Sequence, residues 1–171
     1  MNQENFEKKL IAAYDKMMER VNHLLDDAEE QALPALQRNI DKAKKQAVEL
    51  KEITSDEAEK VAEYLRRDLH DAAVYLENTG KELSSWLSFD LQLVEQRMLD
   101  LFARVTDKTR LELNRLAAQA KRAQEYHTGE ITGIGTLICA ACGSEIHFKK
   151  TSRIPPCPKC HKTVFKRSHK H

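Results

Sequence analysis

Apolar residues recur every three or four positions through most of the first 125 residues. This spacing is typical of an amphipathic helix that packs on another helix, and the positions between are mostly Lys, Glu, Asp, Arg and Gln. No sustained alternation of apolar and polar residues predicts a strand there. The periodic positions are Leu10, Tyr14, Met17, Val21, Leu24 and Ala28, then Leu33, Leu36, Ile40, Ala43, Ala47 and Leu50, and later Leu87, Leu91, Val94, Met98, Leu101 and Val105. The pattern predicts four helices, over residues 4–32, 34–52, 55–78 and 81–125.

Capping motifs mark two of the predicted helix starts. The run from Thr54 to Glu57 has the form of a capping box, in which each of these two side chains binds the backbone N–H of the other residue, and the run from Thr79 to Glu82 repeats it. Pro34 leaves two alternatives open, because proline fits the first turn of a new helix and also fits a kink in a continuous one.

The last predicted helix determines the expected shape. At 1.5 Å per residue, a helix over residues 81–125 would be about 67 Å long. A monomeric globule of this size does not accommodate such a helix comfortably. We therefore expect an elongated antiparallel helical bundle or coiled coil, and a homo-oligomer.

Gly, Pro and Cys are concentrated toward the other end of the chain. Of 5 Gly and 4 Pro in 171 residues, seven lie between Gly129 and Pro158, and all 4 Cys lie between Cys139 and Cys160. This composition divides the chain into a helical bundle or coiled-coil region over residues 1–126 and a second region over residues 127–171. Short strands are predicted in the second region, over residues 135–138, 145–149 and 163–165.

The cysteines form two C-x-x-C pairs, Cys139 with Cys142 and Cys157 with Cys160, with 14 residues between the pairs. Zn²⁺ prefers four tetrahedral thiolates, and a two-residue spacer lets one tight turn present two sulfurs to the same ion. One such pair is compatible with redox chemistry, whereas two pairs at this separation indicate a metal site. The sequence therefore predicts a mainly α protein with a small C-terminal β zinc ribbon.

Two residues follow the cysteine pairs directly. Gly143 comes after the first pair, where the chain commonly needs a positive φ, and His161 holds the equivalent place after the second. Histidine is among the residues enriched at positive φ, so we interpret His161 as a turn residue. The disfavoured alternative is that His161 or His147 replaces a cysteine as a metal ligand.

The C-terminal region resembles a known family. The run TGEITGIGTLICAACG at residues 128–143 and the run PPCPKC at residues 155–160 are similar to the bacterial zinc-ribbon-containing proteins of unknown function. Those proteins join a charged helical N-terminal region to one C-terminal ribbon. The resemblance is specific over about the last 45 residues and compositional over the helices. It implies zinc ligands at Cys139, Cys142, Cys157 and Cys160, and it lends no catalytic residues.

A four-cysteine zinc site is coordinatively closed, whereas catalytic zinc keeps one position open for water or substrate. We therefore expect one structural zinc ion per chain. The ion is needed because about 45 residues bury too little apolar surface to fold reliably without a staple. The rest of the sequence contains no Gly-rich phosphate loop and no nucleophile elbow, so we do not expect an enzyme. Thiol redox sensing, with release of zinc, is a lesser alternative.

Charge also separates the two regions. Residues 127–171 carry eight Lys and Arg against two Glu, a formal charge of +6, and the remaining residues carry −5. The first residues contain no positively charged segment followed by an apolar run, and no apolar stretch approaches the ~20 residues that span a bilayer. We therefore expect a cytoplasmic protein that binds no membrane and whose thiols stay reduced.

Two classes of function fit these features. We favour a protein-interaction or scaffolding module, in which the bundle oligomerises and the ribbon docks a protein partner. The alternative is a nucleic-acid-binding protein, in which ribbon Lys and Arg neutralise phosphates and Phe148, Phe165 or His147 stack on bases. Four thiolates with Zn²⁺ contribute −2, which lowers the ribbon's charge to +4, and the acidic helices would repel a polyanion.

Overall fold

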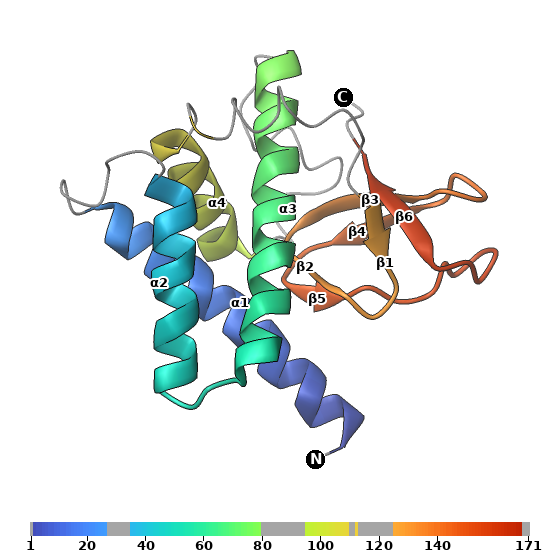
Figure 1. Ribbon diagram of the computed structural model, residues 1–171. Helices are drawn as coiled ribbons and strands as arrows, with labels where there is room; N and C mark the ends of the chain where they lie inside the picture. Colours follow the sequence, from blue (N-terminus) through green and yellow to red (C-terminus); the bar gives the residue numbers. More distant parts are fainter. Residues whose placement is uncertain (1, 27–34, 80–94, 110–111, 113–124, 169–171) are drawn as a thin grey trace.

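Helices come first and short strands last in the computed structural model, which describes residues 2–26, 35–79, 95–109, 112 and 125–168 (Figure 1). The helices in these segments are α1 (Gln3–Leu25), α2 (Ala35–Glu49), α3 (Ser55–Thr79) and α4 (Gln96–Lys108). The strands are β1 (Glu125–His127), β2 (Ile131–Thr132), β3 (Gly135–Cys139), β4 (Glu145–Phe148), β5 (Ser152–Arg153) and β6 (Val164–Arg167).

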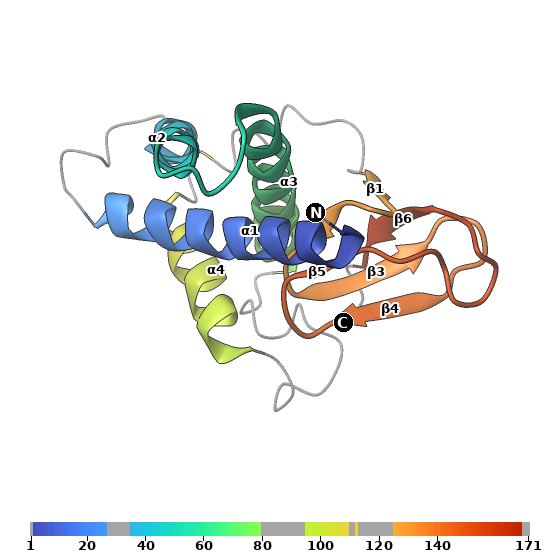
Figure 2. The same ribbon diagram turned by 90° about the horizontal axis from the view of Figure 1, so that it is seen from below.

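Helix α1 runs across the other three helices and packs against each of them (Figures 1 and 2). α2 and α3 lie side by side and are joined by a short loop. The predicted apolar stripes therefore meet in one core, and the prediction of a mainly α fold is confirmed. No helix within the described segments combines the length and the apolar character needed to cross a bilayer. The buried residues of α1 are Ala13, Tyr14, Met17, Met18, Val21, Asn22 and Leu25.

The capping box at the start of α3 is confirmed atom by atom. The backbone N–H of Glu57 donates to Thr54 Oγ1 at 3.2 Å, and the N–H of Thr54 donates to Glu57 Oε2 at 2.9 Å. Each side chain thus satisfies a donor that has no partner inside the helix. The second predicted box extends to Glu82, and its residues 80–82 lie outside the described residues.

Helix α2 begins with a cap from a distant part of the chain. The carboxylate of Glu112 accepts hydrogen bonds from the backbone N–H groups of Leu36 at 2.7 Å and Gln37 at 3.0 Å. A carboxylate at this position also matches the positive end of the helix dipole. Asp26 closes α1, and α2 packs beside α1. The alternative of one kinked helix over residues 4–52 is therefore wrong, while Pro34 itself lies outside the described residues.

The single long helix predicted over residues 81–125 is also wrong. Helix α4 covers only Gln96–Lys108 of that range, and Glu125 already belongs to strand β1. At the start of α4, Glu95 is extended and its N–H donates to the carbonyl of Lys149 in the ribbon. At the end, the Thr109 hydroxyl donates to the Val105 carbonyl at 2.6 Å, a local bond that competes with helical pairing. Neither end of α4 can be predicted from the apolar spacing alone.

The ribbon consists of two antiparallel sheets. A four-stranded sheet has the order β1-β6-β3-β4, and β2 pairs with β5 in a small second sheet. The three predicted strands correspond to β3, β4 and β6, whereas β1, β2 and β5 were not predicted. The ribbon has a small core of its own, made by Tyr126, Leu137, Cys139, Phe148, Ile154, Cys157 and Phe165.

The ribbon packs directly on the helices. Ile131 and Ile134 are fully buried and belong to the helical core rather than to the ribbon's own core. Between them, a Cβ atom at Gly133 would lie 2.7 Å from both the Phe102 ring and the Tyr14 hydroxyl, so only glycine permits this approach. The two regions that the sequence separates therefore share one apolar interface (Figure 1).

Candidate metal centre

Two matching turns position the four cysteines. Cys139 ends strand β3 and Cys142 lies in the turn that follows, while the turn with Cys157 and Cys160 precedes strand β6. Each turn closes with a hydrogen bond of 2.9 Å, from the N–H of the fifth residue to the carbonyl of the first cysteine. That fifth residue has a positive φ in both turns, 77° at Gly143 and 63° at His161. The expectation that both follow their cysteine pairs as turn residues is therefore confirmed.

The four sulfur atoms lie within 4.8 Å of one another. The distance is 3.5 Å from Cys139 Sγ to Cys160 Sγ and 3.6 Å from Cys142 Sγ to Cys157 Sγ. A tetrahedral zinc ion with Zn–S bonds of about 2.3 Å separates its sulfurs by about 3.8 Å, whereas a disulfide would bring them to about 2.05 Å. The spacing fits a tetrahedral metal site, and all four cysteines are free thiols.

The protonation of these thiols also fits a bound cation. Hydrogen bonds with the side chain and backbone of Ser144 lower the pKa of Cys142 to about 6. The backbone N–H of Lys162 would lower the pKa of Cys160, but desolvation and the three neighbouring thiols outweigh it and raise that pKa to about 12. Sulfurs this close cannot all become thiolates unless a positive charge lies among them. A divalent ion held by these four sulfurs would supply that charge.

The two histidines do not join the cluster. Within the described segments, the cysteines are the group whose ligand atoms converge, and His147 Nδ1 instead forms a 2.9 Å hydrogen bond with Thr136 Oγ1. The positions of two ribbon phenylalanines also contradict the expectation that they stack on bases. Phe148 and Phe165 are buried in the ribbon core, so neither ring is available to stack on a base.

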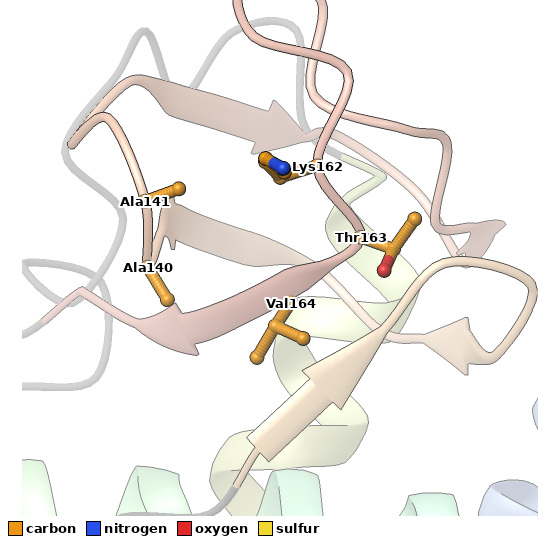
Figure 3. Close-up of a pocket in the computed structure, with 5 residues that line it drawn as sticks. All are labelled: Ala140, Ala141, Lys162, Thr163 and Val164. Carbon is orange, nitrogen blue, oxygen red and sulfur yellow. The ribbon is translucent and has the colours of Figure 1, made fainter.

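A shallow hollow lies beside the first cysteine turn (Figure 3). Its volume is about 280 Å³. The small side chains of the C-A-A-C turn leave it open on one side, and strand β6 forms the other side. Lys162 is the charged residue in a lining that otherwise consists of Ala140, Ala141, Thr163 and Val164.

A second polar site, which the sequence analysis did not find, lies between α3 and the ribbon. Asp68 of α3 is fully buried and accepts hydrogen bonds from Tyr14 Oη at 2.5 Å and from Gly133 N–H at 2.8 Å. Its other oxygen lies 3.3 Å from Nη2 of Arg167, a β6 side chain that is 1% exposed. We call this group the Asp68 cluster; its members are Tyr14, Arg67, Asp68, Asp71, Tyr126 and Arg167.

The charges of the Asp68 cluster face groups of opposite sign. Two guanidinium groups lie beside two carboxylates, and Arg67 also pairs with Glu130 of the ribbon at 2.7 Å. Asp71 accepts a hydrogen bond from Tyr126 Oη. Arg67 stacks 3.9 Å from the centre of the Tyr126 ring. Burial alone would lower the pKa of Arg167, but Tyr126, Asp68 and Asp71 outweigh it and raise that pKa. Burial is the main reason that the pKa of Tyr126 lies well above its usual value, so the Tyr126 hydroxyl stays a neutral donor.

One signal in the sequence pointed to this cluster. Asp68 falls on the apolar stripe of α3, among Leu65, Leu69 and Ala72, where a charged residue is expensive unless it has partners. Its partner Arg167 lies far along the chain, as does Tyr126, which donates to Asp71, and no local pattern marks either residue. The cluster is closed to solvent, and it serves as a contact between elements.

Comparison with known proteins identifies relatives of this chain. The model of the zinc-ribbon containing domain family matches residues 23–169, which include α2, α3, α4 and the ribbon but only the last three residues of α1. The uncharacterized protein YbeL of Escherichia coli strain K12 is 31% identical over 103 residues, which are 60% of this chain and 63% of YbeL. YbeL of E. coli O157:H7 matches to the same extent. The chain thus spans about 63% of the length of the curated relatives it matches, and no solved structure matches significantly.

Proposed function

Because the chain belongs to the zinc-ribbon containing domain family, we propose that it is a zinc-dependent protein-interaction module with one structural zinc ion per chain. The observation that carries the proposal is the convergence of Cys139, Cys142, Cys157 and Cys160 at the spacing of a tetrahedral thiolate site. When bound, the ion supplies a cross-link between the two cysteine turns. The chain's own residues make the remaining contacts of the ribbon, which are its strand pairing and its small apolar core.

A structural role suits this site better than a catalytic one. Four protein thiolates complete the coordination of zinc, so no position is left for water or substrate. The described ribbon core is small and includes two of the four cysteines, so the metal would replace apolar burial that the ribbon lacks. We therefore propose a protein without catalytic activity at this centre.

The surface around the cysteine turns supports an acidic protein segment as the partner. Lys159 and Lys162 are exposed at the second turn, and Lys162 borders the shallow hollow beside the first turn (Figure 3). The hollow has an apolar lining that suits a small side chain, and the lysines suit neighbouring carboxylates. This surface lies on the part of the ribbon away from the helices (Figure 1).

Nucleic-acid binding is the second candidate, because exposed lysines also attract phosphates. Two features make it the weaker one. Phe148 and Phe165 are buried, so the two phenylalanine rings cannot form a stacking platform. Arg167 is buried in the Asp68 cluster, and Arg153 lies 3.3 Å from Glu7 of α1, so both arginines already face carboxylates of the helices.

Zinc content is the first test. Elemental analysis of the full chain, combined with light scattering before and after treatment with a strong chelator, should give one zinc per 19.7 kDa chain. Absence of zinc, with cysteines that are paired or freely reactive, would contradict the proposal and favour a thiol redox sensor. The same light scattering tests the expected homo-oligomer, since a mass of one chain contradicts it.

Site-specific cross-linking tests the partner class. A photoreactive residue at position 162 should form protein adducts in cells that disappear in Cys157→Ser, while the same residue at exposed Lys60 of α3 should not. Labelled DNA and RNA are titrated in parallel between about 50 and 200 mM salt. Affinity that falls steeply with salt, and is lost in a Lys159→Glu and Lys162→Glu double variant, would replace the protein partner with a nucleic acid.

A further inference from the structure

The cysteine turns and the Asp68 cluster are joined by one short strand. Strand β6 begins four residues after Cys160 and ends at Arg167. Its Phe165 is paired in register with Cys139 of β3, and its Val164 carbonyl accepts the N–H of Ala140 in the first turn at 3.0 Å. The strand that delivers Arg167 to α3 is therefore held at its other end by both cysteine turns.

Strand β1 brings a second member of the cluster to the same place. Tyr126 of β1 pairs in register with Phe165 of β6, and its hydroxyl lies 3.2 Å from Arg167 Nε. Two cluster members thus depend on the same pair of strands. If β6 loses its pairing, Arg167 and Tyr126 leave α3 together, and Asp68 and Asp71 lose the partners that these two strands carry, while the Gly133 N–H remains a ribbon donor to Asp68.

The other side of the cluster belongs to the helices. Asp68 and Asp71 lie on α3, and Tyr14 reaches Asp68 from α1. Asp68 and Arg167 are both essentially without solvent exposure, and Arg67 of α3 is a second guanidinium beside Asp68, at 3.3 Å. Removing one partner from a buried group of charges is strongly unfavourable. Part of the free energy of docking therefore depends on strand β6, which carries Arg167.

We propose that zinc binding and docking of the ribbon on α1 and α3 are energetically coupled through the Asp68 cluster. This inference rests on the zinc site proposed above. Zinc folds the cysteine turns, the turns fix β6, and β6 sets Arg167 against Asp68. Because coupling between two sites is reciprocal, Asp68 strengthens zinc binding although it lies on a helix and contacts no cysteine. Loss of zinc releases the ribbon from the helices and exposes the faces of α1 and α3 that it covers.

The direct test is the zinc affinity of a variant altered only on the helical side. We expect Asp68→Asn to bind zinc about 5- to 150-fold more weakly than the wild-type chain, measured by competition with a chromophoric chelator. The matched control is Glu63→Gln, which removes an exposed carboxylate from the same helix and should leave the affinity unchanged. Equal zinc affinity in wild type and Asp68→Asn would overturn the coupling.

A milder variant covers the case in which Asp68→Asn does not fold. Tyr14→Phe removes only the hydroxyl that donates to Asp68, and it should also weaken zinc binding, by a smaller factor. Its control is Ile40→Val, a change in the helical core on α2 that leaves the cluster intact. Weaker zinc binding in Ile40→Val, to the same extent, would attribute the effect to general destabilisation and overturn the role of the cluster.

Hydrogen exchange of the wild-type chain gives an independent readout. Removal of zinc should increase deuterium uptake in the ribbon and also in residues 11–18 of α1 and 61–73 of α3, while α2 keeps its protection. Increased uptake confined to the ribbon would show that the two regions are independent. The two proposals fail differently, because a chain that binds no zinc refutes the metal site, whereas normal zinc binding without any response in the helices refutes only the coupling.

Discussion

The helical region and the ribbon are stabilised by different means. The helical core is a continuous set of apolar side chains from all four described helices, with residues such as Met17, Leu65 and Phe102 completely buried. The ribbon core has seven members, and two of them are cysteines. Apolar burial contributes in proportion to its area, so we expect the helices to depend mainly on packing and the ribbon on a cross-link. The contact between the two regions is of a third kind, with charged residues surrounded by apolar ones.

Loss of a cysteine should give the largest difference between the regions. Cys157→Ser removes a buried member of the thiol cluster, and we expect the ribbon to lose its fold because zinc binding and folding are one process in such domains. Amide resonances of residues 125–168 should collapse to unfolded positions in NMR spectra with zinc present, while most helical resonances stay dispersed. Exposed Lys150→Ala in the same ribbon is not expected to have this effect, and a folded ribbon in Cys157→Ser would contradict the structural role of zinc.

Enlarging Gly133 tests the apolar part of the contact between the regions. A Cβ atom there would lie 2.7 Å from the Phe102 ring, so we expect Gly133→Ala to destabilise the protein by roughly 1–3 kcal/mol in urea unfolding. Phe102→Leu should recover part of this loss in a double-mutant cycle, because it removes part of the ring that clashes. Strictly additive effects would mean that the ribbon does not approach the helices this closely.

An ion pair of the helical region should show a smaller effect that depends on pH. Both guanidinium nitrogens of Arg20 bind Glu52, at 2.8 and 2.5 Å, and the hydrogen bond with Arg20 is the main cause that lowers the pKa of Glu52. A lowered carboxyl pKa adds stability above the unfolded value near 4.5, and that stability is lost as pH falls through the lower folded value. Glu52→Gln should therefore cost about 0.2–1 kcal/mol at pH 7, and this cost should shrink as pH falls below 4.5, as measured by urea unfolding.

The sequence predicted those parts of the molecule that depend on local patterns. Apolar spacing predicted the cores of the helices, the Thr54 and Glu57 side chains marked the start of α3, and the cysteine spacing predicted the thiol cluster. The ends of α4 at Glu95 and Thr109 were missed, because the Glu95 N–H binds a carbonyl of the ribbon, while the N–H and hydroxyl of Thr109 both bind the Val105 carbonyl. Apolar periodicity continues across both positions.

Contacts between residues far apart in the sequence account for the rest. The cap of α2 comes from Glu112, 76 residues beyond the N–H of Leu36 that it binds. Arg167 lies 99 residues beyond Asp68. In the sequence, both Arg167 and Arg153 count toward the basic surface expected to neutralise phosphates, whereas the structure pairs each of them with a carboxylate on a helix. A charge that looks free in a single sequence is therefore weak evidence for a polyanion partner.

The smallest predicted effect has the opposite dependence on pH and belongs to the contact between the regions. Asp15 of α1 accepts a hydrogen bond of 2.5 Å from Thr151 of the ribbon, but burial, the largest cause, raises the pKa of its carboxyl. A raised carboxyl pKa reduces stability when the group is charged in both states, and the penalty disappears as pH falls through the folded value to the unfolded value near 3.8. Asp15→Asn keeps an oxygen for Thr151 and should therefore stabilise the chain at pH 7 by roughly 0.5 kcal/mol, with no difference near pH 3. Urea unfolding of both variants over one pH series would then show Glu52→Gln below wild type and Asp15→Asn above it at neutral pH, with all three converging in acid. A destabilised Asp15→Asn at pH 7 would mean that the charge itself, through Thr151, holds the ribbon to α1.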